Sequence, residues 1–300
     1  MANLKATISG IGLENPLMLA SGILDENGYT MKNILESGAA AVVTKSIGRS
    51  ERTGYRPPIV AEIPDGLLNA VGLANPGIDN FANEMRMARE VGKPVIGSIF
   101  GGTVEEFIYV GRKMEEYGAS ALELNLSCPH VIGVGSEVGS DPELVEEIIG
   151  ALKGRVKIPV WAKLSPNVTD ILKIAESADR ADAFVVINTV RGMAIDIHAR
   201  RPVLSNAYGG LSGRAIKNVG IRYTYQLYKE TGKPIIGVGG IETYKDALEY
   251  IMAGASAVEI GTGLYTKGKS IFQEICRGLS SFMDSEGVTS IKDIVGAAVN

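Results

Sequence analysis

The chain has 300 residues, 45% of them hydrophobic, and its 30 Lys and Arg against 34 Asp and Glu give a net charge of −4. This composition excludes a disordered chain, and the weak negative charge leaves no basic face for a nucleic-acid partner. Two cysteines exclude a disulfide scaffold, and the uncharged stretches are too short to span a bilayer. The first residues carry no secretory signal, so we expect a cytoplasmic protein without membrane contact.

Short apolar runs recur along the chain, each followed by a polar or glycine-rich turn and a helical pattern. Their near-continuous hydrophobicity is typical of strands buried on both faces of a parallel sheet. We expect eight strands, at residues 16–20, 41–44, 94–99, 121–125, 159–163, 184–188, 235–238 and 257–260. The helical patterns cover about 28–37, 79–91, 104–117, 141–153, 168–178, 216–230, 243–253 and 269–283.

Eight strands that alternate with eight helices predict a (β/α)₈ barrel, the TIM-barrel α/β fold, as a single domain over residues 1–300. The connections at 45–93 and 189–234 are long, and a loop rich in glycine and serine follows the fourth strand. All three leave the carboxyl ends of strands, where barrels of this kind build active sites. We therefore expect ordered insertions after strands two, four and six.

Polar side chains or bare glycines follow most of the predicted strands. Turn preference alone explains many of them, because Ser, Asn and Gly favour turns. It does not explain Lys45 and Lys163, which directly follow apolar runs and need an anionic partner such as a phosphate, a carboxylate or an electron-rich ring. The strings GVGGIET (237–243) and GTGL (261–264) favour a phosphate group bound by backbone N–H groups after the last two strands.

Cys128, in the string NLSCPH after the fourth strand, is the sharpest local feature. Both a structural and a catalytic role are open from its position alone, and a thiol acts as a base where its site favours proton transfer. Cys276 lies in a helical pattern, which favours core packing, and His198 is expected to face solvent or to pair with Asp196. With the two cysteines so far apart, we expect no metal site.

Several motifs occur together in a recognisable order. They are LENPLMLASG (13–22), TKSI (44–47), NAVGLANPG (69–77), NLSCP (125–129), NTVRGM (188–193) with Asp196, YGGLSG (208–213), GVGGI (237–241) and AVEIGTGLY (257–265). In this combination the sequence resembles the class 1 dihydroorotate dehydrogenases, most closely the catalytic subunit of class 1B, over essentially the whole chain. The resemblance implies a (β/α)₈ barrel with one FMN at its mouth, in agreement with the strand pattern.

The resemblance also implies a role for individual residues. Cys128 matches the base that takes the C5 proton of dihydroorotate while FMN takes the C6 hydride, which yields orotate for pyrimidine biosynthesis. The substrate pocket corresponds to Lys45, Asn69, Ala70, Val71, Gly72, Leu73, Asn125, Asn188 and Thr189. The flavin site corresponds to Ser21, Lys45, Ser46, Asn125, Lys163, Ile187, Gly213, Gly239, Gly240, Gly261 and Thr262. Two positions depart from the family pattern, because His130 and Ser98 replace asparagines found in many members.

The resemblance to class 1B further implies a homodimeric core with a second subunit that carries FAD and an iron–sulfur cluster and links the enzyme to NAD. Two separated cysteines cannot bind such a cluster. Three alternatives stay open: a non-redox lyase or isomerase that uses Lys45 or Lys163 on a phosphorylated metabolite, a related flavin dehydrogenase of uracil-like rings, and a binding subunit without turnover. Flavin absorbance of the purified protein separates a flavin dehydrogenase from the lyase or isomerase, and a dye-reduction assay separates it from the binding subunit.

Overall fold

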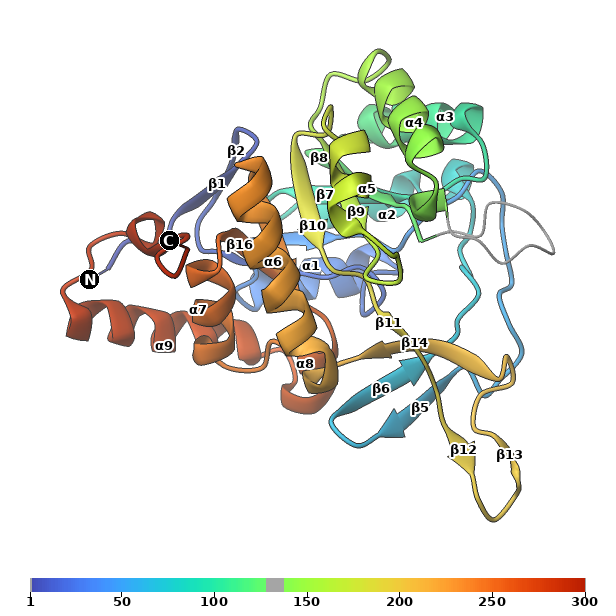
Figure 1. The fold of residues 1–300 in the computed structure, drawn as a ribbon. Helices are drawn as coiled ribbons and strands as arrows, with labels where there is room; N and C mark the ends of the chain where they lie inside the picture. Colours follow the sequence, from blue (N-terminus) through green and yellow to red (C-terminus); the bar gives the residue numbers. More distant parts are fainter. Residues whose placement is uncertain (1, 128–137, 300) are drawn as a thin grey trace.

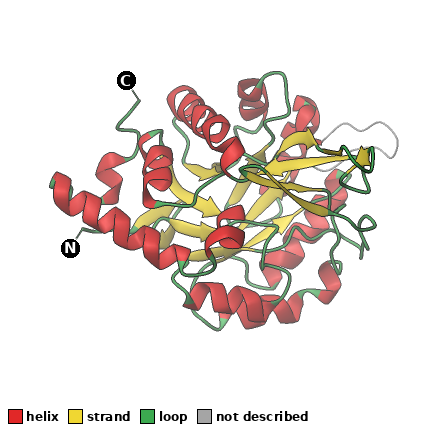
Figure 2. Cartoon of the chain, turned by 90° about the horizontal axis from the view of Figure 1, so that it is seen from below, coloured by secondary structure: helices red, strands yellow, loops and turns green. Residues whose placement is uncertain are grey.

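A closed barrel of eight parallel strands forms the centre of the molecule (Figures 1 and 2). The computed structural model describes residues 2–127 and 138–299. In chain order the barrel strands are β3 (Leu17–Leu19), β4 (Ala41–Val43), β7 (Val95–Ile99), β8 (Ala121–Asn125), β9 (Val160–Leu164), β10 (Ala183–Val186), β15 (Ile235–Val238) and β16 (Ala255–Ile260). Each lies within two residues of a predicted strand, and neighbours in sequence order are neighbours in the barrel, so the predicted fold is confirmed.

Helices cover the outside of the barrel (Figure 2). They are α1 (Gly28–Glu36), α2 (Ala82–Arg89), α3 (Val104–Glu116), α4 (Pro142–Lys153), α5 (Ile171–Ser177), α6 (Lys217–Thr231), α7 (Tyr244–Met252), α8 (Thr262–Lys267) and α9 (Ile271–Glu286). Helix α4 starts within one residue of the predicted helical pattern at 141–153: Pro142 is its first residue, and the Asp141 carboxylate accepts from Glu143 N and Leu144 N. The short helix α8 was not predicted, because six residues after a glycine-rich turn show no period.

Apolar side chains fill the barrel and the layer between barrel and helices. Residues that alternate along the strands point inward, and Trp161 on β9, which has no exposed surface, is the largest of them. The opposite faces of the same strands pack against the helices. Burial on both faces explains why the strands are continuously hydrophobic in sequence.

A second, antiparallel sheet stands beside the barrel mouth and combines two distant parts of the chain. Its strands are β11 (Val190–Met193), β14 (Tyr208–Ser212), β6 (Gly66–Asn69) and β5 (Val60–Ile63), in that order across the sheet. β5 and β6 come from the long connection after β4, and β11 and β14 from the connection after β10. The connection after β8 falls largely on residues 128–137, outside the described residues.

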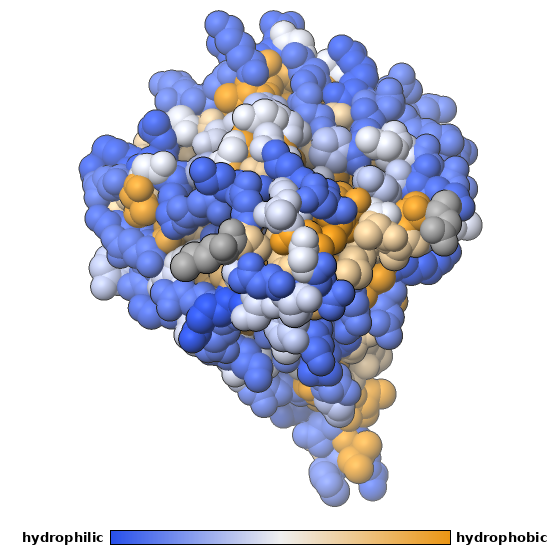
Figure 3. Space-filling model, turned by 90° about the vertical axis from the view of Figure 1, so that its left-hand side faces the viewer, coloured by the Kyte–Doolittle hydropathy of each residue, from blue (hydrophilic) through white to orange (hydrophobic). Residues whose placement is uncertain are grey.

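A hairpin of β12 (Ile195–Asp196) and β13 (Arg201–Pro202) extends beyond this sheet (Figure 1). Ile195 and Ile197 of this hairpin, and Met193 at the end of β11, are all more than half exposed. Figure 3 shows hydrophobic groups at the tapering lower end of the molecule, where Figure 1 places the hairpin.

The remaining elements close the other end of the barrel or connect its units. The hairpin of β1 (Ala6–Ile8) and β2 (Ile11–Leu13) covers the amino-terminal end of the barrel, where Ser9 Oγ donates to the Asp182 carbonyl at 3.0 Å. The described residues also form four short 3₁₀ segments: η1 (Ile78–Asn80), η2 (Val138–Ser140), η3 (Arg214–Ile216) and η4 (Ile291–Ile294). Within residues 2–127 and 138–299, no helix combines the length and the hydrophobicity that a membrane crossing requires.

Candidate active site

A network of hydrogen-bonded polar side chains crosses the carboxyl end of the barrel. The Ser46 hydroxyl, after β4, lies 2.9 Å from the Ser98 hydroxyl of β7 and 3.4 Å from the Ser21 hydroxyl after β3. The Asn125 amide, at the end of β8, donates to Ser46 Oγ at 3.1 Å, and the Asn188 amide donates to Asn125 Oδ1 at 3.3 Å. The ends of β3, β4, β7, β8 and β10 thus share one polar network, at the end where barrels bind ligands.

Local backbone contacts fix the orientation of the two asparagines. The Thr189 N–H donates to Asn188 Oδ1 at 2.8 Å, so the NH₂ group of Asn188 faces Asn125 Oδ1 and Ser127 Oγ, the latter at 2.9 Å. The Ser127 N–H donates to Asn125 Oδ1 at 3.2 Å. The amides therefore present defined donors and acceptors, which suits a planar ring with alternating N–H and C=O groups.

Lys45 lies at the mouth beside a buried carboxyl group. It is 8% exposed, and its Nζ lies 3.8 Å from Glu26 Oε1. Behind it, Asp25 has no exposed surface, and burial raises the pKa of Asp25 to about 6, although the Gly22 N–H and the Lys45 charge act in the opposite direction. Lys45 thus places a cation at the mouth.

Lys163, on β9, lies between two buried glutamates. Its Nζ is 3.1 Å from Glu123 Oε1 on β8 and 3.1 Å from Glu259 Oε2 on β16. Burial lowers the pKa of Lys163, but the charges of the two carboxyl groups outweigh this and raise the pKa above its ordinary value, so the ammonium stays charged. The anionic partner expected for Lys163 from the sequence is therefore the pair of carboxyl groups of Glu123 and Glu259.

Glycines form a close backbone cradle where β14, β15 and β16 end. Gly213, Gly239 and Gly240 have φ of +90°, +125° and +68°, which side chains disfavour. A Cβ on Gly240 would lie 2.8 Å from the Gly213 carbonyl oxygen, whereas a Cβ on Gly261 would meet only the Ala20 Cβ, at 3.5 Å. Thr262 Oγ1 donates to Ser212 Oγ at 2.8 Å and joins the β14 and β16 ends. These glycines lie after the last two barrel strands, where the sequence predicts that backbone N–H groups bind a phosphate.

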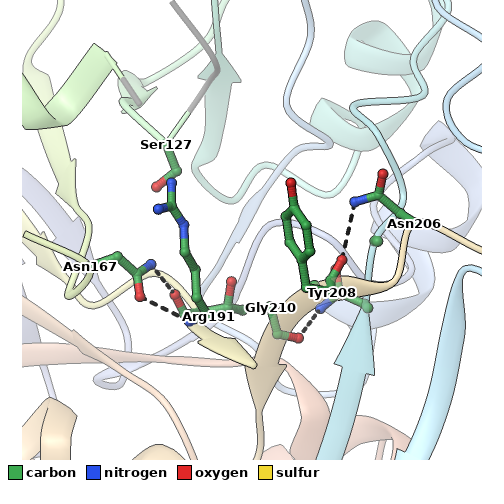
Figure 4. Close-up of a pocket in the computed structure, with 10 residues that line it drawn as sticks. Ser127, Asn167, Arg191, Asn206, Tyr208 and Gly210 are labelled. Carbon is green, nitrogen blue, oxygen red and sulfur yellow. Dashed lines mark hydrogen bonds between the residues drawn. The ribbon is translucent and has the colours of Figure 1, made fainter. Parts of the chain in front are cut away.

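A pocket of about 220 Å³ adjoins this network between the barrel and the second sheet. It is lined by Asn69, Ala70, Ser127, Asn167, Thr189, Arg191, Asn206, Tyr208, Gly209 and Gly210. Asn167 Nδ2 donates to the Thr189 carbonyl at 2.9 Å while its Oδ1 accepts from the Arg191 N–H, and the Arg191 side chain extends toward Ser127 (Figure 4). The volume is below the roughly 300 Å³ at which drug-sized pockets begin, so it suits a small ring.

The structure brings many of the predicted site residues together. Asn69, Ala70 and Thr189 line the pocket, and the Asn69 amide donates to the Gly210 carbonyl at 3.1 Å across β6 and β14. Val71, Gly72 and Leu73 continue from β6 but are not among the described lining residues. Ile187 is buried, and its N–H donates to the Val238 carbonyl at 3.3 Å. Cys128 and His130 lie outside the described residues.

Other site residues were not predicted. Sequence reasoning missed Asp25, Glu123, Ser127, Asn167, Arg191, Asn206, Tyr208, Gly209, Gly210 and Glu259 as site residues. Asn167 follows the fifth strand, so the rule that polar residues beyond a strand end are candidates would have included it. Glu123 and Glu259 carried a signal too, since each interrupts a buried apolar strand with a charge.

The remaining sequence expectations concern residues away from the mouth, except for Ser98. Cys276, on α9, packs against the core as expected, and burial raises the pKa of its thiol to about 11. His198 is exposed as expected, and its backbone N–H donates to Asp196 Oδ1 at 2.9 Å. Ser98, although shorter than the asparagine of many family members, still reaches Ser46.

Comparison with known proteins gives a consistent result. The sequence model of the family described as "Dihydroorotate dehydrogenase" matches residues 3–283. A protein of Thermoplasma acidophilum is 64% identical over 299 residues, covering all of both chains. A protein of Methanocaldococcus jannaschii is 49% identical, and the match covers 98% of each chain. A protein of Pyrococcus furiosus is 48% identical, and the match covers 99% of each chain. All three are named dihydroorotate dehydrogenase B (NAD(+)), catalytic subunit.

Proposed function

The chain belongs to the dihydroorotate dehydrogenase family, and on that premise we propose that it oxidises dihydroorotate to orotate in pyrimidine biosynthesis as the catalytic subunit of a class 1B enzyme. The observation that carries the proposal is the oriented polar network from Ser21 to Asn188, which adjoins a small pocket at the barrel mouth. The whole chain, residues 1–300, is proposed to act as one FMN-binding domain in the cytoplasm.

The pocket chemistry supports a pyrimidine acid as the substrate. The ring of dihydroorotate has amide N–H and C=O groups, and Asn69, Asn125 and Asn188 offer matching acceptors and donors. Its carboxylate needs a cation, and Lys45 at the mouth supplies one. Thr189 and Ala70 complete the lining. Val71, Gly72 and Leu73 are proposed to contact the substrate through the segment that follows Asn69.

The described residues fit a flavin mononucleotide. The glycine cradle of Gly213, Gly239 and Gly240 with Gly261 and Thr262 would receive the phosphate, because its backbone N–H groups carry no side chains that would block a close approach. Ser21, Ser46, Asn125, Lys163 and Ile187 would line the ring system at the mouth. When bound, FMN supplies the two-electron acceptor for the reaction.

Cys128 is proposed as the base that takes the proton from C5 of the substrate. It follows Ser127 directly, and Ser127 lines the pocket and bonds to Asn188. A thiol has an ordinary pKa near 8.5, so a base role requires a site that favours the thiolate or couples it to proton transfer.

The proposed electron acceptor is a second subunit. The relatives' names specify a catalytic subunit and NAD, which implies another chain for the NAD reaction in those proteins. We propose that this chain likewise works as a homodimeric core with a partner that carries FAD and an iron–sulfur cluster.

Steady-state kinetics of the isolated chain test the proposal. With dihydroorotate as donor, we expect reduction of an artificial dye but no appreciable reduction of NAD or fumarate. Rapid NAD reduction without a partner would refute the two-subunit assignment, and rapid fumarate reduction would assign the chain to class 1A. If the purified chain contains no flavin and dihydroorotate does not reduce the dye, the proposed oxidation of dihydroorotate is refuted.

A further inference from the structure

In the barrel interior, two buried carboxyl groups, those of Glu123 and Glu259, contact the single ammonium group of Lys163. Glu123 and Glu259 both approach the same Lys163 Nζ at 3.1 Å, and both side chains are fully buried. Lys163 is the register partner of Asn125, and Glu123 lies two residues before Asn125 on β8. The three charged groups therefore lie directly below the polar network of the mouth.

A count of the charges shows why this arrangement is unusual. In the described strands packed around the two glutamates, the neighbours in register are Met18 on β3, Ser98 on β7, Trp161 on β9 and Val238 on β15. Lys163 is thus the one charged group that faces the glutamates within the described part of the barrel. One ammonium against two ionised carboxylates would leave a buried net charge of −1, which a low-dielectric interior strongly disfavours.

The hydrogen bonds show the same imbalance. Glu123 Oε2 and Glu259 Oε1 are buried without a hydrogen-bond partner within the described structure. A proton on one of the two carboxyl groups gives both orphan oxygens a role, because the protonated oxygen donates to the other group. Burial, and after it the charge of Glu123, raise the pKa of Glu259 well above its ordinary value against the effect of Lys163. Two like charges in one site titrate as a pair.

We propose that Glu123 and Glu259 share one proton and act together as positioning residues that hold the Lys163 ammonium and set the charge it presents to the flavin. The shared-proton pair makes the three-residue cluster neutral while Lys163 stays ionised. Its flavin part rests on the proposed function, whereas its protonation part does not.

The pair makes a specific prediction for stability. In Glu259→Gln the remaining carboxylate of Glu123 still balances Lys163, and in Glu123→Gln the carboxylate of Glu259 does so. Both single variants therefore retain a neutral cluster, and each should unfold at nearly the denaturant concentration of the wild type. The double variant leaves Lys163 without a counter-charge and should unfold at a much lower concentration, a strong departure from additivity.

Infrared spectroscopy tests the shared proton directly, without catalysis. At pH 8 the Asp25 carboxyl, whose pKa is about 6, is ionised, so it does not contribute a carboxylic-acid C=O band. We expect such a band in the wild-type full-length chain, sensitive to deuterium, and its loss in both Glu259→Gln and Glu123→Gln. Asp182→Asn removes a carboxylate that pairs with Lys153 next to the start of β10, and should leave the band unchanged.

The flavin potential tests the second half of the proposal. At a pH low enough for Lys163 to stay protonated, the double variant should shift the reduction equilibrium of the bound flavin toward the reduced form by about tenfold or more, because the Lys163 charge is then no longer offset. The single variants should shift it by less than about threefold near neutral pH. The Asp182→Asn control should leave the equilibrium unchanged.

Each outcome decides one part. If the wild type has no carboxylic-acid band, or if each single variant is as unstable as the double variant, the shared proton is refuted. If the band and the stability pattern are found but the flavin equilibrium does not respond to the double variant, the link through Lys163 is refuted. A protein that shows the band but takes up no flavin would overturn the proposed function and leave the shared proton intact.

Discussion

Replacing Asp25 with asparagine should stabilise the protein at pH 8, although it removes a charge beside Lys45. Asp25 is fully buried, one of its carboxylate oxygens has no hydrogen-bond partner among the described residues, and the other accepts from the Gly22 N–H at 2.6 Å. Asparagine keeps that acceptor and has no charge to bury. The neutral side chain should therefore fit this site better than the carboxylate does.

The pKa of Asp25 sets the size of the effect. Its pKa is about 6 in the folded protein against an ordinary value of 3.8. An acid whose pKa is raised by folding stabilises the protein fully below its unfolded pKa, and this contribution is lost as the pH rises through the folded pKa. At about 1.36 kcal/mol per pKa unit, the loss between pH 3.8 and pH 6 is about 3 kcal/mol. Asp25→Asn should regain most of it at pH 8.

Denaturant unfolding of the wild type and the variant from pH 4 to pH 8 measures the effect. The advantage of Asp25→Asn should be small at pH 4 and should grow up to about pH 7. Asp246→Asn is the matched control with the opposite sign. Although burial acts to raise the pKa of Asp246, its bonds to Lys217 and Thr243 outweigh this and lower it, so the control should lose stability at pH 8. An Asp25→Asn variant that is equally or less stable than the wild type at pH 8 would refute the reasoning.

Three further substitutions test the site. Cys128→Ala should lower turnover by about 10²–10⁴-fold with FMN retained, as expected for loss of a general base. Cys276→Ala is the control and should leave turnover nearly unchanged, so equal effects of the two substitutions would contradict the base assignment. Gly240→Ala should release FMN, because its Cβ would lie 2.8 Å from the Gly213 carbonyl oxygen. Gly232→Ala has a similar φ but no neighbouring atom within 4 Å of the added Cβ, so it should retain FMN. The fluorescence of FMN that passes through an ultrafiltration membrane distinguishes the two variants. Asn188→Ala should raise the KM for dihydroorotate more than it weakens FMN binding, since it removes the amide that faces Ser127; the reverse ranking in titrations would place Asn188 in the flavin site.

The barrel could be predicted from the sequence because its signal is local and repeated. Eight apolar runs, each followed by a helical period, specify strands that are buried on both faces. The second sheet could not be predicted in the same way, because β6 and β14 pair across more than a hundred residues and are short and rich in glycine. Their pairing depends on the closed barrel, which brings both long connections to one end.

The site was predictable only in part, for a similar reason. Residues at strand ends, such as Asn125 and Asn188, could be located from the strand pattern alone. The partners of Lys163 could not, since Glu123 and Glu259 lie on strands far apart in sequence and meet only across the closed barrel. The Asn167 contact with Thr189 likewise depends on how two neighbouring loops fold together.

Anaerobic addition of dihydroorotate to the purified chain tests the central claim most directly. We predict that the absorbance of the bound flavin bleaches in a single turnover without any partner subunit, and that orotate forms in a one-to-one ratio with reduced flavin. A flavin that dithionite bleaches but dihydroorotate does not, in protein with intact Cys128 and Lys45, would contradict the assignment.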